Sequence, residues 1–181
     1  FTDTAVEICS KKGINMKKGK LDSVWYSEGI FDVVVSMEVL EHINNPLEEI
    51  NHIYKIIRKR GVFYFTTPNF NAFERCFLKS DYNNICYPEH LCYYTKKTIN
   101  YLLTNNGFRK KKLETTGISL TQIRIGRGVS KEPLNSASSA DEQIRKTFER
   151  NKLLQKVKKS LNLILSFLGI GNTLKGLYEK I

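Results

Sequence analysis

Two carboxylates and an imidazole lie within five residues of one another in the first quarter of the chain. Glu38, Glu41 and His42 are spaced i, i+3 and i+4, so a helical turn beginning at Met37 would place them on one face. Carboxylate and imidazole ligands together suit a divalent ion such as Mg²⁺ or Mn²⁺. His90, from a later segment, could close the same site, so we predict a metal site formed by these four side chains.

A metal held in this way would bind the vicinal hydroxyls of a substrate and lower the pKa of the hydroxyl that attacks. Two other interpretations stay open. His42 or His90 could act without a metal, as a general base for a hydroxyl substrate. Alternatively, the segment Leu40-Glu-His42 could be a surface turn that caps a helix and carries no chemistry.

Alternating strand and helix patterns predict the elements that hold these residues. The apolar, β-branched run Phe31-Asp-Val-Val-Val-Ser36 is typical of a strand buried on both faces, which implies a parallel sheet. Pro at the first helical position and Gly after a basic last turn indicate the helix that follows. The expected strands are 14–18, 31–36, 62–67, 108–116 and 172–181, and the expected helices include 46–58 and 95–106.

The C-terminal part departs from this alternation. Residues 126–140 are rich in Ser, Gly and Pro, which predicts a linker, and residues 141–168 have the apolar spacing of a long amphipathic helix. This helix could cover the sheet as an insertion before the last strand, which we favour, or act as a lid. Its lysines beside Leu and Phe side chains also permit peripheral contact with an anionic membrane.

Composition narrows the classes of partner. The chain has 181 residues and a formal net charge of +11, which favours acidic partners, but its basic residues are dispersed and nucleic-acid binding is not expected. Four cysteines without CxxC spacing argue against a zinc site. The longest apolar run is too short to cross a bilayer and no secretory signal is evident. We therefore expect a cytoplasmic protein with free thiols.

Three segments, in this order and spacing, carry a family resemblance: FDVVVSMEVLEHI at 31–43, GVFYFTTPN at 61–69, and PEHLCYYTKKTINYLLTNNGF at 88–108. Together with the ending GNTLKGLYEKI, they resemble class I S-adenosylmethionine-dependent methyltransferases of the ubiquinone-biosynthesis O-methyltransferase type. The resemblance implies a Rossmann-like α/β fold: a mostly parallel sheet, helices on both faces and an antiparallel last strand. It implies S-adenosylmethionine as the methyl donor.

The same resemblance assigns roles to particular residues. Met37 matches the residue after the fourth family strand that contacts the cofactor, and Leu21 and Asp22 match the region beside the adenine. The spacing from Glu38 to His42, with His90 downstream, is similar to that in some ubiquinone-type O-methyltransferases and small-RNA 3′-end methyltransferases. Asn69 is expected to border the substrate pocket.

One part of the family pattern has no match. Family members carry a glycine-rich loop after the first strand and an acidic residue after the second. The 181 residues contain neither, and Gly126-Arg-Gly128 lies late in the chain, before the predicted linker. We therefore expect the first strands to be missing, the 31–36 strand to have an unpaired apolar edge, and the chain alone to be oligomeric or poorly soluble and inactive.

We accordingly predict one partial methyltransferase domain over residues 1–181. Its expected activity is methyl transfer to a hydroxyl of a small molecule, a glycan or a lipid precursor. Two alternatives remain: a non-catalytic binding module with the same fold, and an RNA-modifying methyltransferase, which would bind RNA with a steep salt dependence.

Overall fold

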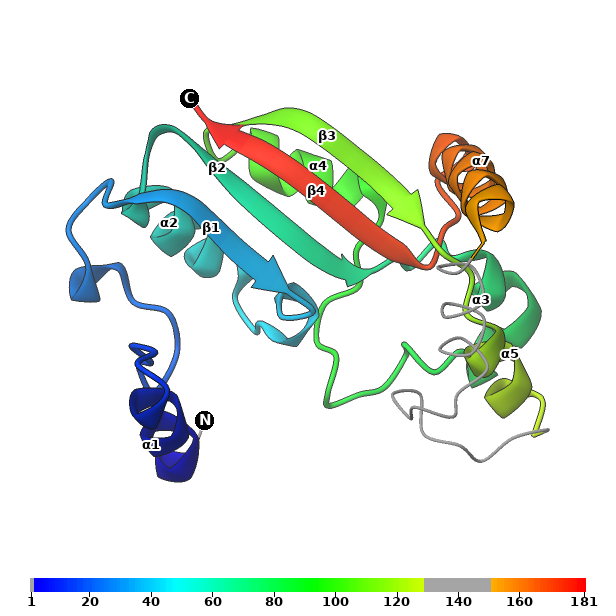
Figure 1. Ribbon diagram of the computed structural model, residues 1–181, viewed down its shortest axis with the longest axis horizontal. Coiled ribbons are helices and arrows are strands. Elements are labelled where there is room, and N and C mark those ends of the chain that lie inside the picture. Colours follow the sequence, from blue (N-terminus) through cyan, green and yellow to red (C-terminus); the bar gives the residue numbers. More distant parts are fainter. Residues whose placement is uncertain (1, 129–150) are drawn as a thin grey trace.

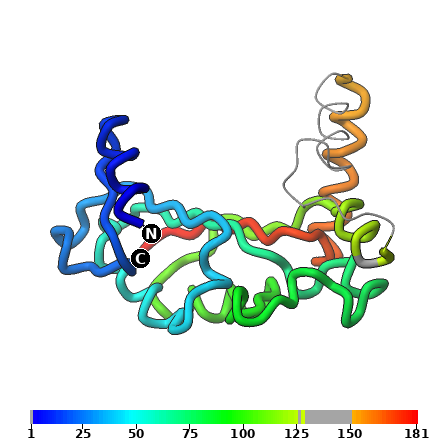
Figure 2. Tube along the Cα trace, turned by 90° about the horizontal axis from the view of Figure 1, so that it is seen from below, coloured from blue at the N-terminus to red at the C-terminus, as the bar shows by residue number. Residues whose placement is uncertain are grey.

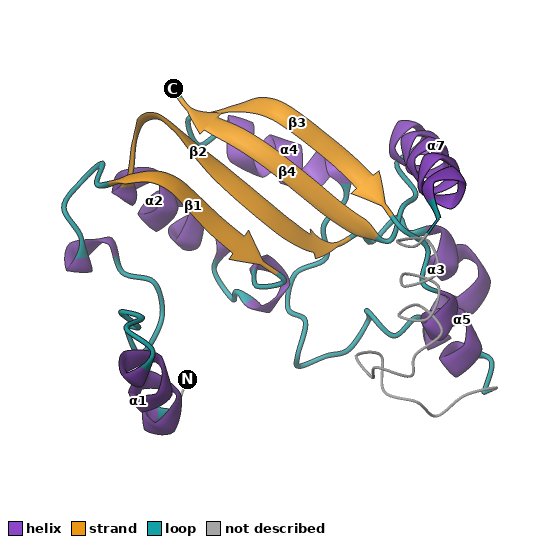
Figure 3. Cartoon of the chain, in the orientation of Figure 1, coloured by secondary structure: helices purple, strands orange, loops and turns teal. Residues whose placement is uncertain are grey.

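The computed structural model describes residues 2–128 and 151–181. Four strands form one sheet in the order β1-β2-β4-β3 (Figures 1 and 3). The strands are β1 (Phe31–Met37), β2 (Ile57–Pro68), β3 (Phe108–Thr116) and β4 (Thr173–Lys180). β1 runs parallel to β2, and β4 lies antiparallel between β2 and β3. The predicted α/β fold with an antiparallel last strand is confirmed.

Strand β1 is less enclosed than its sequence indicates. Val33 and Val35 are about half exposed, at 51% and 53%, whereas Val34, on the other face, packs against the core. Among the described residues β1 pairs only with β2, so one backbone edge of the strand is open. The prediction of burial on both faces is therefore wrong, because the described helices α2 (Pro46–Ile56) and α4 (Lys96–Thr104) both lie on one face of the sheet (Figure 2).

Strand β2 starts earlier than predicted. The helix before it, α2 (Pro46–Ile56), ends at Ile56, and the chain turns directly into the sheet at Ile57. The basic run 58–60 therefore belongs to the strand rather than to the last helical turn, and Arg60 takes a positive φ of 61°. Gly61 follows because an added Cβ would lie 2.8 Å from the carbonyl oxygen of Asp32 on β1.

The core lies between the sheet and helices α2 and α4 (Lys96–Thr104), which cover the same face (Figure 2). Thr95 and Thr98 form a capping box at the start of α4. Helix α4 ends before Gly107, which has φ of +83° and packs against the ring of Tyr54. The buried core side chains include Ile50, Ile53, Ile99, Leu103, Phe63, Phe65, Phe108, Leu174 and Tyr178.

Residues 14–18, predicted as a strand, form no strand. They follow helix α1 (Asp3–Lys11), which Thr2 caps, and they lead to the short 3₁₀ turn η1 (Ser23–Trp25). Ile14 is 54% exposed. A strand needs a partner for its backbone N–H and C=O groups, and in the described residues this segment lies beside no strand. The apolar spacing of Ile14 and Met16 alone could not supply one.

The segment after β2 carries α3 (Phe73–Leu78) and the turn η3 (Lys79–Asp81). After β3 comes α5 (Leu120–Gly126), for which no prediction was made. The predicted linker falls mainly outside the described residues, as do residues 141–150 of the predicted long helix. The described remainder of that helix is α7 (Lys152–Leu168), capped at Asn151. No described helix has the length and apolar character needed to cross a membrane.

The open edge of β1 gives a first testable prediction. Val35→Lys is expected to reduce self-association of the chain, because a charged side chain on an edge strand opposes pairing with a second copy. Sedimentation velocity over a range of protein concentrations measures the effect, with Val24→Lys as a control at an exposed site outside the sheet. A wild-type chain that stays monomeric at all concentrations would contradict it.

A second prediction concerns acid stability. Hydrogen bonds from Lys111 and Arg109 on β3 hold the pKa of Glu179 below its ordinary value. Because its pKa is lower in the fold than in the unfolded chain, ionised Glu179 contributes stability above about pH 5. This contribution is lost as the pH falls through about 4 and below. Glu179→Gln is expected to flatten the decline in thermal midpoint between about pH 5 and pH 3. Circular dichroism measures it, with exposed Glu28→Gln as the control.

Candidate active site

The exit of strand β1 places the first acidic residues of the site. Glu38 follows β1 with a φ of 50°, and the 3₁₀ turn η2 (Leu40–His42) follows it, so the predicted helical turn from Met37 does not form. Glu41 is nevertheless directed inward and is 2% exposed. Its Oε2 accepts a hydrogen bond of 2.8 Å from the hydroxyl of Thr67 on β2.

Backbone hydrogen bonds bring His90 to this turn. The carbonyl oxygen of Glu41 accepts from the amides of Leu91 and Cys92, at 2.7 and 2.9 Å. The segment that contains His90 is thereby fixed beside η2, although nearly fifty residues separate the two in sequence. The predicted proximity of His90 to Glu41 is what the structure shows.

Both imidazoles bond a backbone carbonyl through the same nitrogen. Nδ1 of His42 lies 2.6 Å from the carbonyl oxygen of Glu89, and Nδ1 of His90 lies 2.8 Å from that of Asn84. A carbonyl oxygen only accepts, so each Nδ1 carries a hydrogen and, in the neutral ring, each Nε2 keeps a lone pair. A carbonyl on the far nitrogen is the usual support of a metal-binding histidine.

Glu41, His42 and His90 form one cluster. One potential ligand atom from each lies within 4.8 Å of the others. Nε2 of His42 is 3.8 Å from Oε1 of Glu41, and the two imidazole rings are 4.8 Å apart between centroids. A buried carboxylate oxygen and two imidazole nitrogens converge at this point, a donor set that could hold a divalent cation.

Glu38 lies at the rim of this cluster rather than within the three-residue group. Partial burial raises its pKa, and the nearby charge of Glu41 acts in the same direction. A hydrogen bond with Thr66 opposes the shift. Glu38 lines the same cavity as the cluster, so three of the four predicted ligands converge and the fourth stays within the same hollow.

The cluster opens into a polar cavity of about 520 Å³. Its lining combines Glu38, Glu41, His42 and His90 with residues of α5 and of the start of β4. The residues that line it are mostly hydrogen-bonding: Glu38, Glu41, His42, Asn83, Asn84, Glu89, His90, Ser119, Gln122, Asn172 and Thr173, with Pro68 and Cys86. This wall favours a ligand that carries several hydroxyl groups over an apolar one.

A second, larger groove of about 1020 Å³ lies on the other side of His42. Leu21 and Asp22, the two residues predicted to lie beside the adenine, line it together with the indole of Trp25. Asp22 Oδ1 accepts from the amide of Val24, which fixes the carboxylate at the groove. Met37 does not line this groove. Its side chain is 60% exposed at the end of β1, so the fold does not bring Met37 together with Leu21 and Asp22, the other two predicted cofactor residues.

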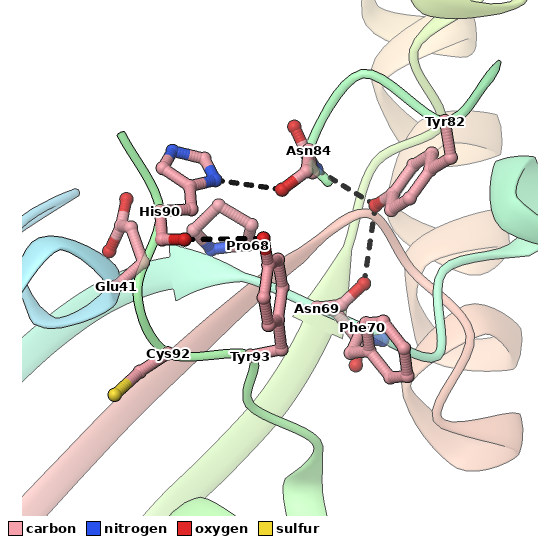
Figure 4. Close-up of a pocket in the computed structure, with 9 residues that line it drawn as sticks. All are labelled: Glu41, Pro68, Asn69, Phe70, Tyr82, Asn84, His90, Cys92 and Tyr93. Carbon is pink, nitrogen blue, oxygen red and sulfur yellow. Dashed lines mark hydrogen bonds between the residues drawn. The ribbon is translucent and has the colours of Figure 1, made fainter. Parts of the chain in front are cut away.

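A chain of hydrogen bonds fixes Asn84, whose backbone carbonyl accepts from Nδ1 of His90. Asn84 donates from its side chain to the hydroxyl of Tyr82, which donates in turn to the carbonyl of Asn69 (Figure 4). Gln122 on α5 donates to the side-chain oxygen of Asn84. The pocket these residues line measures about 10 Å³, which is room for about one water, so it is packing space rather than a ligand site.

Several of these supporting residues were not predicted. Thr67, Asn84 and Gln122 lie in three different elements, and their positions in the sequence carry no spacing that links them to Glu41 or His90. Asn69 was expected at the substrate pocket. Its side chain instead donates to the carbonyls of Gly169 and Gly171, at 2.9 and 2.7 Å, and ties the α7–β4 connection to the end of β2.

The sheet order, the site at the strand ends and the covering helices define a Rossmann-like class I S-adenosylmethionine-dependent methyltransferase fold. Comparison with solved structures agrees. An S-adenosylmethionine-dependent methyltransferase from Thermotoga maritima superposes with a TM-score of 0.61 at 12% identity, over 99% of this chain and 70% of that one. One from Mesorhizobium loti gives 0.56 at 14% identity, over 99% and 77%.

Sequence comparison identifies the family. The family described as "Methyltransferase domain" matches residues 2–113, and the chain belongs to it. A mitochondrial ubiquinone biosynthesis O-methyltransferase of Dictyostelium discoideum is 30% identical over 71 residues. That match covers 38% of this chain and 22% of the relative, so the chain aligns with about a fifth of that protein's length.

Proposed function

We propose that this domain transfers a methyl group from S-adenosylmethionine to a hydroxyl of a hydroxyl-rich small molecule, glycan or lipid precursor, with a divalent cation at Glu41, His42 and His90. The observation that carries the proposal is the position of His42. It lines both the groove with Leu21 and Asp22 and the polar cavity with His90. A cofactor in the first and an acceptor in the second would meet at this residue.

The residues of the groove fit the adenosine part of the cofactor. Leu21 and Trp25 offer apolar surface for a purine ring, and Asp22 offers a carboxylate that can accept from an amino or hydroxyl group. When bound, S-adenosylmethionine supplies an electrophilic methyl group. The chain's own contribution is to hold the acceptor oxygen in line and to help remove its proton.

The three-residue cluster fits a divalent cation. The carboxylate is fixed by Thr67, both imidazoles are oriented by backbone carbonyls, and each has its Nε2 available. Two imidazoles beside one carboxylate suit Mn²⁺ or another transition metal better than Mg²⁺, which prefers oxygen ligands. A cation there would lower the pKa of a bound hydroxyl. Without one, the Nε2 of either histidine can accept the proton directly.

The cavity wall supports a hydroxyl-bearing acceptor. Asn83, Ser119, Gln122 and Asn172, which carry side-chain amides and a hydroxyl, line the same cavity as Glu41, His42 and His90. Such groups select for substrates that can pair with them, since an analogue that lacks a hydroxyl leaves a buried partner unpaired. This favours a polar diol over the aromatic head of an apolar quinol.

Two titrations of the 181-residue chain test the proposal. In the first, methyl β-riboside, a vicinal diol, is titrated with and without Mn²⁺, and its 2-deoxy analogue is the matched control. We expect binding that requires Mn²⁺ and is about tenfold weaker or more for the deoxy compound. Equal binding of both sugars, or no effect of Mn²⁺, would count against the metal-held diol.

In the second titration, S-adenosylhomocysteine is added to the chain and to Asp22→Asn. The variant is expected to bind about tenfold more weakly, because it loses a charged hydrogen-bond acceptor at the groove. Glu28→Gln, at an exposed site outside the groove, is the control. An unchanged affinity in Asp22→Asn would exclude this groove as the cofactor site.

A further inference from the structure

Helix α7 carries a row of exposed apolar side chains. Leu153, Val157, Leu161, Ile164 and Leu168 recur at spacings of three or four and form one stripe along the helix, here called the apolar stripe. Each is at least 44% exposed, and Leu153 reaches 69%. Phe167, beside the stripe, is 90% exposed. Of the seventeen residues of α7, only Leu165 is buried.

The helix is held to the domain by a different side. Asn162 accepts from the amide of Gly117, Leu165 offers its carbonyl to the hydroxyl of Thr115, and Ser166 offers its carbonyl to Lys96. At about 100° per residue, Asn162 and Ser166 lie on one side of Leu165 and the apolar stripe lies on the other. Figure 2 shows α7 extending away from the sheet on the side opposite α2 and α4.

The charges on α7 have one sign. Lys152, Lys156, Lys158 and Lys159 occupy its first half, and its seventeen residues contain no Asp or Glu. An exposed apolar stripe flanked by lysines without counter-charges is the pattern of a helix that lies in the plane of an anionic membrane surface. The length and composition of the helix do not suit a span across the bilayer.

We propose that α7 docks the protein on an anionic lipid surface, with the apolar stripe in the boundary between headgroups and acyl chains and the lysines against lipid phosphates. A second copy of the chain fits the stripe less well, because α7 has no acidic side chain that could pair with the four lysines of another α7. The proposal concerns this surface alone and does not depend on the proposed methyl transfer.

Vesicle flotation of the whole chain tests the proposal. Flotation is preferred to pelleting because an aggregated chain stays at the bottom of the gradient. Vesicles of phosphatidylcholine with about one-third phosphatidylserine are compared with pure phosphatidylcholine, and we expect about tenfold tighter binding to the anionic vesicles at low salt. Raising the salt to about 0.5 M should remove most of that difference.

Two variants assign the binding to α7. The double variant Val157→Gln with Ile164→Gln should lower binding to anionic vesicles about tenfold or more, because the stripe loses two apolar side chains. Val24→Gln, at another exposed apolar site, should bind as the wild type does. Both altered stripe residues are more than half exposed, so the fold should survive, and circular dichroism verifies it.

The results of these experiments distinguish a lipid surface from a second copy of the chain as the partner of the apolar stripe. No binding to anionic vesicles, equal binding to neutral ones, or full binding by the stripe variant would each overturn the proposal. A concentration-dependent dimer that the stripe variant abolishes would assign the stripe to a second copy and overturn it as well. Salt-sensitive binding to anionic vesicles that is lost in the stripe variant and kept in Val24→Gln would establish it.

Discussion

Glu41→Gln is expected to weaken the binding of Mn²⁺ to this chain by about a hundredfold or more. Changes to residues that merely support a metal ligand cost about ten- to a hundredfold in affinity, and a ligand itself should cost at least as much. The variant removes the one buried negative charge of the Glu41–His42–His90 cluster. Electron paramagnetic resonance, which detects free Mn²⁺, measures the affinity of the chain for Mn²⁺ in a titration.

The matched variants make this result specific. The backbone carbonyl of Glu41 still accepts from Leu91 and Cys92 in Glu41→Gln, so the segment of His90 should remain in place. Thr67→Val removes only the hydroxyl that fixes Oε2 and should cost about tenfold. Glu28→Gln, an exposed carboxylate outside the cavity, should cost nothing. A wild-type chain that binds no Mn²⁺ would leave the histidines as general-base candidates only.

The second large effect expected is on stability. Gly176→Ala in the centre of β4 should destabilise the fold by about 3 kcal/mol, because overpacking of a rigid core costs about 1–3 kcal/mol and sometimes more. An added Cβ would lie 2.3 Å from Cε1 of Phe65. Phe65 is fully buried and stacks on Tyr178, with 6.0 Å between ring centroids, so its ring has little room to move.

Urea unfolding followed by circular dichroism measures the loss. Gly13→Ala is the steric control, since nothing lies within 4 Å of its added Cβ, and only its φ of +71° should cost about 1 kcal/mol. The double variant Gly176→Ala with Phe65→Leu should lose less stability than the sum of the two single variants, because the smaller side chain at position 65 makes space for the added Cβ. Strict additivity of the two changes would show that the clash with Phe65 is not the cause.

The chemistry of the candidate site was readable from local spacing. Glu41 and His42 adjoin a strong strand pattern, and His90 lies in a segment that the family resemblance singles out. Strand β1, helix α2, the capped helix α4 and the antiparallel last strand follow from periodicity, caps and the resemblance. These features depend on neighbours in the sequence, or on a shared family pattern, so no long-range contact had to be known.

Other features were decided by contacts between distant residues. The 14–18 segment has strand-like composition but no partner strand in the described chain, so it stays irregular. Met37 follows the predicted strand, yet its side chain is exposed and does not reach the groove of Leu21 and Asp22. The supports of the cluster, Thr67 and Asn84, come from elements that no local pattern joins.

The sequence by itself determined which residues are available for chemistry and where strands β1 to β4 and helices α2 and α4 form, because capping, periodicity and strand composition act over a few residues. Tertiary structure alone decided that Glu41 is buried, that Nδ1 of both histidines bonds a backbone carbonyl, and that His42 lines two cavities. Burial and tautomer depend on which carbonyls and hydroxyls the fold brings near, and those partners come from residues up to about fifty positions away.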